Sequence, residues 1–214
     1  MKILIADDHD LVLKGMQVNV QEVLGSTCKI SFATNGIEVI KKLEVNSYDM
    51  LITDLNMPLT DGLEMIANAL RIDKNLKILV VTVNEESAFA PRFLSAGVFG
   101  YVNKNQPDEI LKEAILRISQ GKRFISDNLA ETFANSYKKK LPDNPFDLLS
   151  TREFEVTNLL LKGFGAIEIA NALSINTSTA SSYRGRVFSK LGIKTLVDLI
   201  RLARQFRLLE DSQI

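Results

Sequence analysis

The chain is poor in cysteine and histidine, with one of each, Cys28 and His9, among its 214 residues. One cysteine excludes an internal disulfide, and the apolar run around Cys28 predicts a small core residue in a reducing compartment. One histidine without a matching set of cysteines and histidines is weak evidence for a metal site. We therefore interpret His9 as a loop residue in preference to a phosphodonor or a metal ligand.

Long apolar runs are also missing. No run reaches the roughly 18 apolar residues that a membrane-spanning helix needs, so we expect no membrane span. The apolar start of the chain stops at Asp7 and Asp8, which is not the pattern of a signal peptide. With 46% apolar and 24% charged residues, the composition is that of a globular protein with one or two cores.

The net charge is zero, but the charges are unevenly distributed. Residues 1–120 hold 12 Lys and Arg against 16 Asp and Glu, a net charge of −4, whereas residues 148–214 hold 9 against 6, a net charge of +3. This asymmetry suggests that the C-terminal part binds a polyanion. A chance distribution of surface charge explains it equally well.

The first 120 residues alternate between β-branched apolar runs and stretches with helical spacing. This alternation predicts βαβ units and a parallel sheet with helices on both faces. Five strands and five helices in about 120 residues fit a small doubly wound domain. The expected strands are residues 2–6, 28–33, 50–53, 77–82 and 99–102.

After residue 120 the pattern changes. Residues 138–147 contain two prolines and three consecutive lysines, which is typical of a linker. From Ser150 the chain has only helical signals, beginning with the capping box "STRE". We therefore predict a domain at 1–120, a linker at 121–146 and an all-α domain at 147–214. A short helix at 126–137 is one interpretation of the stretch inside this linker.

Polar residues stand at the ends of four of the predicted strands. In a doubly wound sheet the carboxyl ends of the strands face one shared site. Carboxylates held close together need a cation, and Mg²⁺ prefers oxygen ligands, while a hydroxyl and an ammonium suit phosphoryl oxygens. We expect a divalent ion, rather than another side chain, to balance the acidic pair, although this pair alone could simply cap a helix. The residues concerned are Asp7, Asp8, Asp54, Thr82 and Lys104.

The stretches "ADDHD", "DLNMPLTDG", "VVTVN" and "GYVNK" resemble the receiver domain of two-component response regulators, whose fold is flavodoxin-like. The resemblance implies that Asp54 accepts a phosphoryl group from a sensor histidine kinase. It implies that Lys104 binds the phosphoryl oxygens and that Thr82 and Tyr101 act as the switch. The implied Mg²⁺ ligands are Asp7, Asp8, Asp54 and the backbone carbonyl of Asn56. Taken singly, Thr82 and Tyr101 also fit plain packing roles, and Lys104 fits a solvated surface lysine.

Two residues depart from the receiver pattern. Pro91 falls inside the expected fourth helix, where it removes a hydrogen bond and kinks the helix unless it lies in the first turn. Val83 follows Thr82 and is bulkier than the small residue often found there. We expect Val83 to crowd the attacking water and to slow dephosphorylation.

Residues 147–210 resemble the LuxR-type helix-turn-helix domain through "TRE", "EIA" and "KLGI". The third helix of this domain then enters DNA, although a solvated helix face is the alternative for its arginines. Departures from the family pattern are Gly165, Ala180, Tyr183 and Gly185, the last in place of a longer polar side chain. The expected contacts are Ser181 and Ser182 to bases, Thr179, Arg184 and Lys190 to phosphates, and Arg186 to either.

Apolar residues continue through the last predicted helix, within residues 195–206. Part of this helix must cover the core of the C-terminal domain. The rest fits a contact with a second copy that matches two half-sites on DNA. Packing within one chain explains each of these residues equally well.

Together these features predict a cytoplasmic response regulator that controls transcription after phosphorylation of Asp54. Its partners are a sensor histidine kinase, promoter DNA, RNA polymerase and a second copy of itself, and its cofactor is Mg²⁺. We expect no enzymatic activity beyond its own phosphorylation and slow dephosphorylation. One alternative is a phosphorylation-independent DNA-binding regulator whose receiver is a dimerisation platform. Another is an aspartyl phosphohydrolase, but Asn56 stands where such enzymes carry a second carboxylate.

Overall fold

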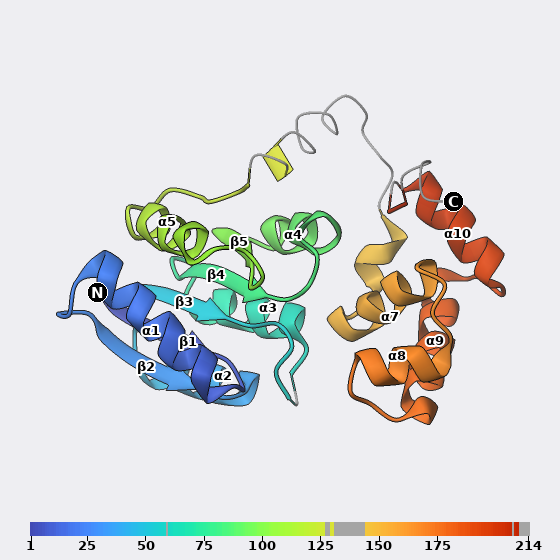
Figure 1. Cartoon of the computed structure of the whole chain (residues 1–214), viewed down its shortest axis with the longest axis horizontal. Coiled ribbons are helices and arrows are strands. Elements are labelled where there is room, and N and C mark those ends of the chain that lie inside the picture. Colours follow the sequence, from blue (N-terminus) through green and yellow to red (C-terminus); the bar gives the residue numbers. More distant parts are fainter. Residues whose placement is uncertain (59, 127–128, 131–143, 207, 210–214) are drawn as a thin grey trace. The chain divides into compact units, whose positions relative to one another are not determined.

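Five parallel strands form a sheet in the N-terminal part of the chain (Figure 1). Their spatial order is β2-β1-β3-β4-β5, which is the order of flavodoxin-like folds. The predicted doubly wound sheet is therefore confirmed, with strand ends that differ from expectation by one residue at most. The strands are β1 (Lys2–Ala6), β2 (Lys29–Ala33), β3 (Met50–Thr53), β4 (Lys77–Thr82) and β5 (Gly100–Asn103).

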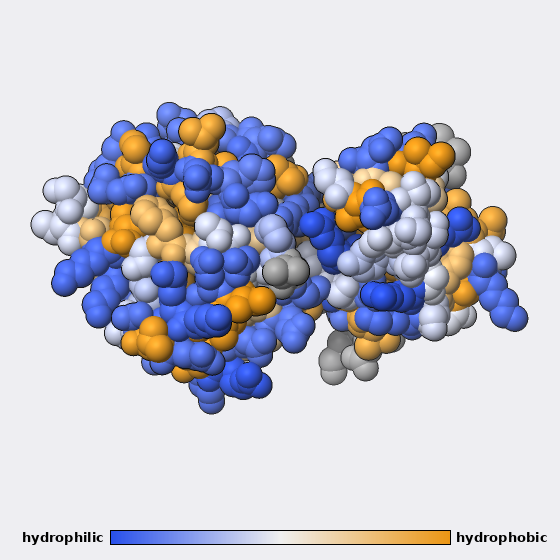
Figure 2. Space-filling view, turned by 90° about the horizontal axis from the view of Figure 1, so that it is seen from below, coloured by the Kyte–Doolittle hydropathy of each residue, from blue (hydrophilic) through white to orange (hydrophobic). Residues whose placement is uncertain are grey.

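The computed structural model describes residues 1–214 except 59, 127–128, 131–143, 207 and 210–214. The chain divides into two units, Met1–Lys138 and Lys139–Ile214. Among the described residues, we find no helix with both the length and the apolar character that a membrane crossing requires. Most of the residues visible in Figure 2 are hydrophilic, and apolar residues are scattered among them.

Helices cover both faces of the sheet. Helices α1 (Asp10–Leu24) and α5 (Asp108–Ser119) contact each other and pack on one face. Residues alternate between the two faces along each strand, so Leu4, Leu51 and Val80 point to the opposite face. The remaining helices of this unit are α2 (Gly36–Val45), α3 (Gly62–Ile72) and α4 (Glu86–Ser95).

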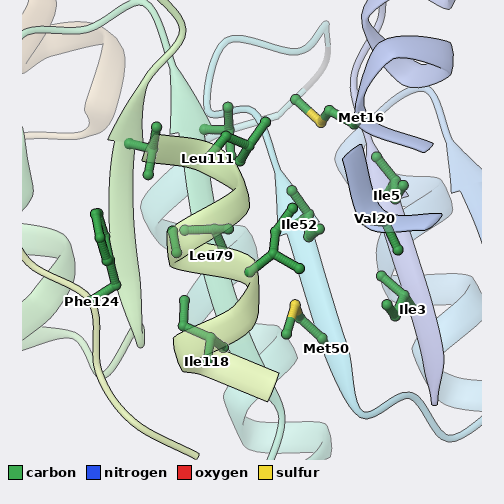
Figure 3. Packing of buried hydrophobic residues seen from close by; sticks show 14 of the residues in the cluster. Ile3, Ile5, Met16, Val20, Met50, Ile52, Leu79, Leu111, Ile118 and Phe124 are labelled. Carbon is green, nitrogen blue, oxygen red and sulfur yellow. The ribbon is translucent and has the colours of Figure 1, made fainter. Parts of the chain in front are cut away.

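A hydrophobic core cluster lies between the sheet and the pair α1 and α5 (Figure 3). Ile3, Ile5 and Ile52 from the strands meet Val20 of α1 and Ile118 of α5, and none of these five is exposed. Burying one such side chain contributes roughly 1.5–3 kcal/mol. Cys28 is partly buried against this cluster, which agrees with the prediction of a small packing residue. This core holds the carboxyl ends of β1 and β3 in fixed positions.

The segment after α5 folds back along the sheet. The backbone N–H of Phe124 donates to the carbonyl of Phe99, and Phe124 forms a parallel bridge with Gly100 of β5. A side chain at position 100 would collide with this segment, because an added Cβ would lie 3.1 Å from the Phe124 carbonyl oxygen and 2.9 Å from Ile118. Phe124 therefore borders β5.

Both ends of the predicted linker belong to folded units, which corrects its boundaries. Phe124 is part of the N-terminal core, and Phe146 is 1% exposed within the C-terminal unit. The predicted helix at 126–137 lies almost wholly outside the described residues. The linker was predicted from its prolines and lysines, and composition could not show that single aromatic residues near its ends are buried.

Pro91 is the sixth residue of α4 and lies inside the helix. It has no N–H, so the carbonyl of Ser87 lacks the donor that an i to i−4 bond would give it. The helix continues for four residues beyond the proline, and Ser95 Oγ donates to the Pro91 carbonyl at 2.8 Å. The predicted interior position of Pro91 is confirmed, and it does not end the helix.

The C-terminal unit is helical, as predicted. Ser150 and Glu153 form the predicted capping box at the start of the first α-helix of this unit. Asn176 precedes the third α-helix as its N-cap but makes no side-chain capping bond. Ala180 and Val187 of the third α-helix are buried, and Leu191 is half-buried. The elements are η1 (Pro145–Leu148), α7 (Thr151–Leu161), α8 (Ala166–Ala172), α9 (Thr177–Leu191) and α10 (Leu196–Gln205).

Candidate functional site

The carboxyl ends of the strands bring charged residues together. Asp7 follows β1, Asp54 follows β3 and Lys104 follows β5. The Lys104 ammonium nitrogen lies 2.5 Å from Oδ2 of Asp7 and 2.6 Å from Oδ2 of Asp54. Asp7 is 0% exposed and Asp54 is 3% exposed, so both carboxylates are almost completely removed from water. The structure therefore assembles three of the predicted site residues.

The charge of Lys104 is held in place by its surroundings. Burial of the ammonium lowers its pKa, but attraction to Asp54 and hydrogen bonds to Asp54 and Asp7 outweigh this effect. The pKa of Lys104 is therefore raised above its ordinary value. Lys104 stays positively charged at neutral pH. Its ammonium can therefore bind other negatively charged oxygens that take the place of the carboxylate oxygens.

The second oxygen of Asp54 is bound by the backbone. Oδ1 accepts hydrogen bonds from the N–H of Leu55 at 2.6 Å and from the N–H of Asn56 at 3.2 Å. These bonds fix the rotation of the carboxylate, while Oδ2 points to the ammonium of Lys104. A buried carboxylate with both oxygens in fixed positions is well placed to act as a nucleophile.

The acidic pair has side-chain partners, which corrects the expectation that only a divalent ion balances it. His9 Nδ1 lies 2.9 Å from Asp8 Oδ1 and 3.3 Å from Asp7 Oδ1, and Lys104 contacts Asp7. Three carboxylates and one ammonium nevertheless leave a formal charge of −2 when His9 is neutral. A divalent cation would neutralise this charge, so the donor set fits Mg²⁺.

Thr82 places a hydroxyl at the end of β4, between β3 and β5 in the sheet. Thr82 is 0% exposed, and its Oγ1 has no hydrogen-bond partner among the described residues. Leaving a buried hydroxyl without a partner costs about 1–3 kcal/mol. A phosphoryl oxygen at the adjacent strand end would supply the missing acceptor.

The predicted DNA contacts occupy α9. Ser181, Ser182, Arg184 and Arg186 are exposed, whereas Thr179 is half-buried. Each arginine lies over an aromatic ring of the same helix. Five of the six predicted residues, including Lys190, are therefore exposed.

Lys190 has a partner within the fold. Its ammonium nitrogen lies 2.6 Å from Oε2 of Glu153 on α7 and 3.3 Å from the carbonyl oxygen of Leu148. Burial raises the pKa of Glu153, but the hydrogen bond from Lys190 and the backbone N–H of Ser150 outweigh it, so this pKa is lowered. Lys190 thus ties α9 to α7, and this role competes with its predicted phosphate contact.

Gly185 lies in the middle of α9, at a position where the fold does not require a glycine. A Cβ added at this position would meet nothing within 4 Å, and the residue is exposed. Glycine inside a helix costs about 1 kcal/mol relative to alanine. Within the described chain we find no contact that offsets this cost.

Comparisons with known proteins support the same division of the chain. The family model of the response regulator receiver domain matches residues 3–116, and that of the luxR family of bacterial regulatory proteins matches residues 147–203. The response regulator GacA of Pseudomonas syringae pv. syringae (strain B728a) is 34% identical over 214 residues, covering 99% of each chain. The chain belongs to the NarL/FixJ group of response regulators.

Other response regulators are similar over nearly their whole length. UvrY of Escherichia coli (strain K12) is 31% identical over 204 residues, covering 95% of this chain and 93% of UvrY. RcsB of Salmonella enterica serovar Typhimurium, solved bound to the rprA promoter with the phosphomimetic BeF3⁻, is 28% identical with a TM-score of 0.60. That match covers 94% of this chain and 97% of RcsB.

In this response regulator, the sequence did not predict a hydrogen-bonded network of asparagines beside the acidic cluster. The buried Tyr101 donates its hydroxyl to the carbonyl of Asn84 at 3.0 Å, and Asn103 Nδ2 donates to the same oxygen at 2.9 Å. The side-chain amide of Asn84 accepts from Asn56 Nδ2 at 3.0 Å. The loop after Thr82 is thus bonded both to Tyr101 and to the loop after Asp54. The only sequence signal was that Asn56 and Asn84 each stand two residues after a predicted site residue.

Proposed function

We propose that this response regulator accepts a phosphoryl group on Asp54 from a sensor histidine kinase in the cytoplasm, with Mg²⁺, and that phosphorylation controls its binding to promoter DNA. The observation that carries this proposal is the contact of Lys104 with both Asp54 and Asp7 at the strand ends. A structural ion pair needs one carboxylate. Two buried carboxylates around one ammonium instead form a site with excess negative charge.

The proposed reaction is an in-line displacement at phosphorus. A carboxylate oxygen of Asp54 forms the new O–P bond, while the bond between phosphorus and the nitrogen of the kinase histidine breaks. The bonding electron pair leaves with that nitrogen. Lys104 is within reach of the transferred oxygens, and the hydroxyl of Thr82, which has no partner among the residues that the structure describes, can donate to one of them.

The residues that would hold Mg²⁺ are Asp7, Asp8, Asp54 and the carbonyl of Asn56. When bound, the ion neutralises charge on the phosphoryl oxygens. His9 contacts both members of the acidic pair and remains, in this proposal, a neighbour rather than a ligand. The formal charge of −2 on the cluster is the property that favours a divalent over a monovalent cation.

The readout begins at the loop after Thr82. A hydrogen bond from Thr82 to a phosphoryl oxygen would shift this loop, and Asn84 in the same loop accepts the hydroxyl of Tyr101. Tyr101 is already inward in this structure, with no exposed surface. We propose that phosphorylation stabilises this inward arrangement and changes the surface near α4 and β5.

The output is transcriptional. The exposed face of α9 would enter the major groove, and two copies would bind two half-sites and act with RNA polymerase. The comparison with RcsB, whose structure was solved on promoter DNA, supports this assignment. The alternative is DNA binding that does not depend on phosphorylation.

The test is the intact mass of the full chain after incubation with a small phosphodonor and Mg²⁺. We expect a gain of one phosphoryl group in the wild type and none in Asp54→Ala. Asp49→Asn is the matched control, because it alters a carboxylate at the amino end of the same strand and should leave the gain intact. No gain in a folded wild type with several donors would overturn phosphorylation and favour the alternative. DNA binding by Asp54→Ala then tells whether the output needs the phosphoryl group.

A further inference from the structure

We propose that α9 binds DNA through two arginine–aromatic pairs, Arg184 with Phe188 and Arg186 with Tyr183, which flank a stripe of small side chains. The two arginines bind phosphates on the two sides of the groove, and the small stripe faces the base edges between them. The two rings are positioning residues that hold the guanidinium groups. This inference rests on the proposed binding of DNA by α9 and assigns the roles of its residues.

The first observation is the stacking of both arginines. The Arg184 guanidinium carbon lies 5.1 Å from the centroid of the Phe188 ring, and that of Arg186 lies 5.6 Å from the Tyr183 ring. Both rings are half-buried and both arginines are exposed. Since the fold limits the motion of the rings, each guanidinium loses less freedom when it binds a phosphate.

The second observation is where these pairs lie around the helix. Ala180 and Val187 are buried and mark the core side of α9. At about 100° per residue, Arg184 and Arg186 are about 200° apart around the axis. Each ring lies one turn from its arginine, so the two pairs border the core side on opposite flanks. A helix in a major groove has a phosphate backbone on each flank, which matches this arrangement.

The third observation concerns the face that points away from the core. Ser178, Ser182, Gly185 and Ser189 follow one another at helical spacing, and all four are exposed. Gly185 weakens the helix. The fold of the domain does not require a glycine there, because an added Cβ would meet no described atom within 4 Å. A surface that approaches this face closely would account for it, and base edges between two phosphate strands are such a surface.

Lys190, the third basic residue of α9, stabilises the domain itself. Lys190 is bound to Glu153 and Leu148 within the domain. The inference therefore moves Lys190 from the predicted phosphate contacts to the fold, and it assigns Arg186, which the sequence left open, to phosphate. Nothing in this assignment depends on which bases are recognised.

The first experiment measures the salt dependence of binding by the full chain to a mixed-sequence duplex of about 30 base pairs, with and without a small phosphodonor and Mg²⁺. Arg184→Gln and Arg186→Gln should each weaken binding roughly tenfold at low salt and lower the slope against salt by about one. Arg204→Gln on α10 removes the same charge from the same unit and should leave the slope unchanged. Unchanged slopes in both α9 variants, with a wild type that binds, would overturn the inference alone. A wild type that binds no duplex under any condition would overturn the proposed DNA-binding function itself.

The second experiment tests the pairing. Tyr183→Leu should weaken binding about two- to fivefold in the wild type and in Arg184→Gln, but not in Arg186→Gln. Phe188→Leu should weaken binding in the wild type and in Arg186→Gln, but not in Arg184→Gln. Tyr183→Phe keeps the ring and should bind DNA with the affinity of the wild type. Equal losses in both arginine backgrounds would reveal a general structural effect and reject the positioning role. Thermal unfolding of each variant checks that α9 still folds.

The third experiment tests the close approach at Gly185. Gly185→Ala should raise the unfolding temperature, and Gly185→Leu should weaken duplex binding although the free protein folds. If Gly185→Leu binds as tightly as the wild type, the small stripe does not face the base edges.

Discussion

Each unit of the molecule contains a lysine that joins distant elements through a carboxylate, and the two arrangements differ in their balance of charge. Lys190 meets Glu153 in a one-to-one pair, and Glu153 also accepts from the N–H of Ser150. Lys104 meets Asp7 and Asp54 at once, with Asp8 nearby. The balanced pair completes the bonding of the C-terminal fold. The unbalanced cluster leaves negative charge, and the Thr82 hydroxyl beside it has no hydrogen-bond partner in the described part of the chain; a ligand can satisfy both.

The largest difference between the two lysines should appear in the rate of phosphorylation. Lys104→Gln removes the cation that faces the transferred oxygens, so phosphorylation by a small donor should slow roughly a hundredfold. Lys190→Gln is the matched variant in the other unit and should react at the wild-type rate. Intact mass against time measures both. Equal rates for the two variants would show that Lys104 is only a structural partner.

The next largest effect should be on stability, at the pair of Lys190 with Glu153. Glu153→Gln replaces a buried charged partner and should lower the free energy of unfolding of the C-terminal unit by about 1–2 kcal/mol. Urea denaturation measures this change. Glu113→Gln is the control, since its pair with Arg117 is half-exposed and should be worth at most about 0.5 kcal/mol. A loss no greater than in the control would mean that the Lys190 pair contributes nothing to the fold.

Removing a carboxylate from the cluster around Lys104 should raise the free energy of unfolding, whereas Glu153→Gln lowers it. Asp8→Asn lowers the excess negative charge, so without Mg²⁺ it should raise stability slightly, by about 0.5 kcal/mol. The same variant should lose the rise in unfolding temperature that Mg²⁺ gives the wild type. A variant that is destabilised without Mg²⁺ would show that the cluster is already balanced.

Acid should weaken the balanced pair. The folded-state pKa of Glu153 is lowered, so its contribution is present above the unfolded value of about 4.3 and is lost as the pH falls through the folded value. Denaturant unfolding of the C-terminal unit between neutral pH and about pH 3 should show this loss. Glu153→Gln should flatten that part of the curve, and an unchanged curve would contradict the assignment.

The smallest effect concerns the lifetime of the aspartyl phosphate. Val83 is 54% exposed beside Thr82, where its side chain is expected to crowd water. Val83→Ala should therefore shorten the half-life of phosphorylated Asp54 a few-fold, as followed by intact mass. A wild-type half-life shorter than that of the variant would refute the expectation.

The sequence predicted those features that depend on local pattern. β-branched runs marked the strands, and parallel strands bring their ends together, so the meeting of Asp54 and Lys104 followed from topology alone. The bond between Tyr101 and Asn84 depends on the path of a loop, which periodicity does not encode. The pairing of Lys190 with Glu153 depends on how α7 packs against α9, between residues far apart in the chain. Charge and helical phase made Lys190 look available for DNA, and only its neighbour shows otherwise.

Phe124 has a consequence for how copies of this protein can associate. The outer strand of a sheet offers unpaired backbone groups that another chain can use to continue the sheet, which is a common route to aggregation. Here the segment at Phe124 already bonds beside β5 through the Phe99 carbonyl and the bridge to Gly100. A second molecule can extend the sheet at this border only after Phe124 is displaced, and displacement would expose an aromatic side chain to water. The chain thus protects the β5 edge of its sheet from intermolecular strand addition.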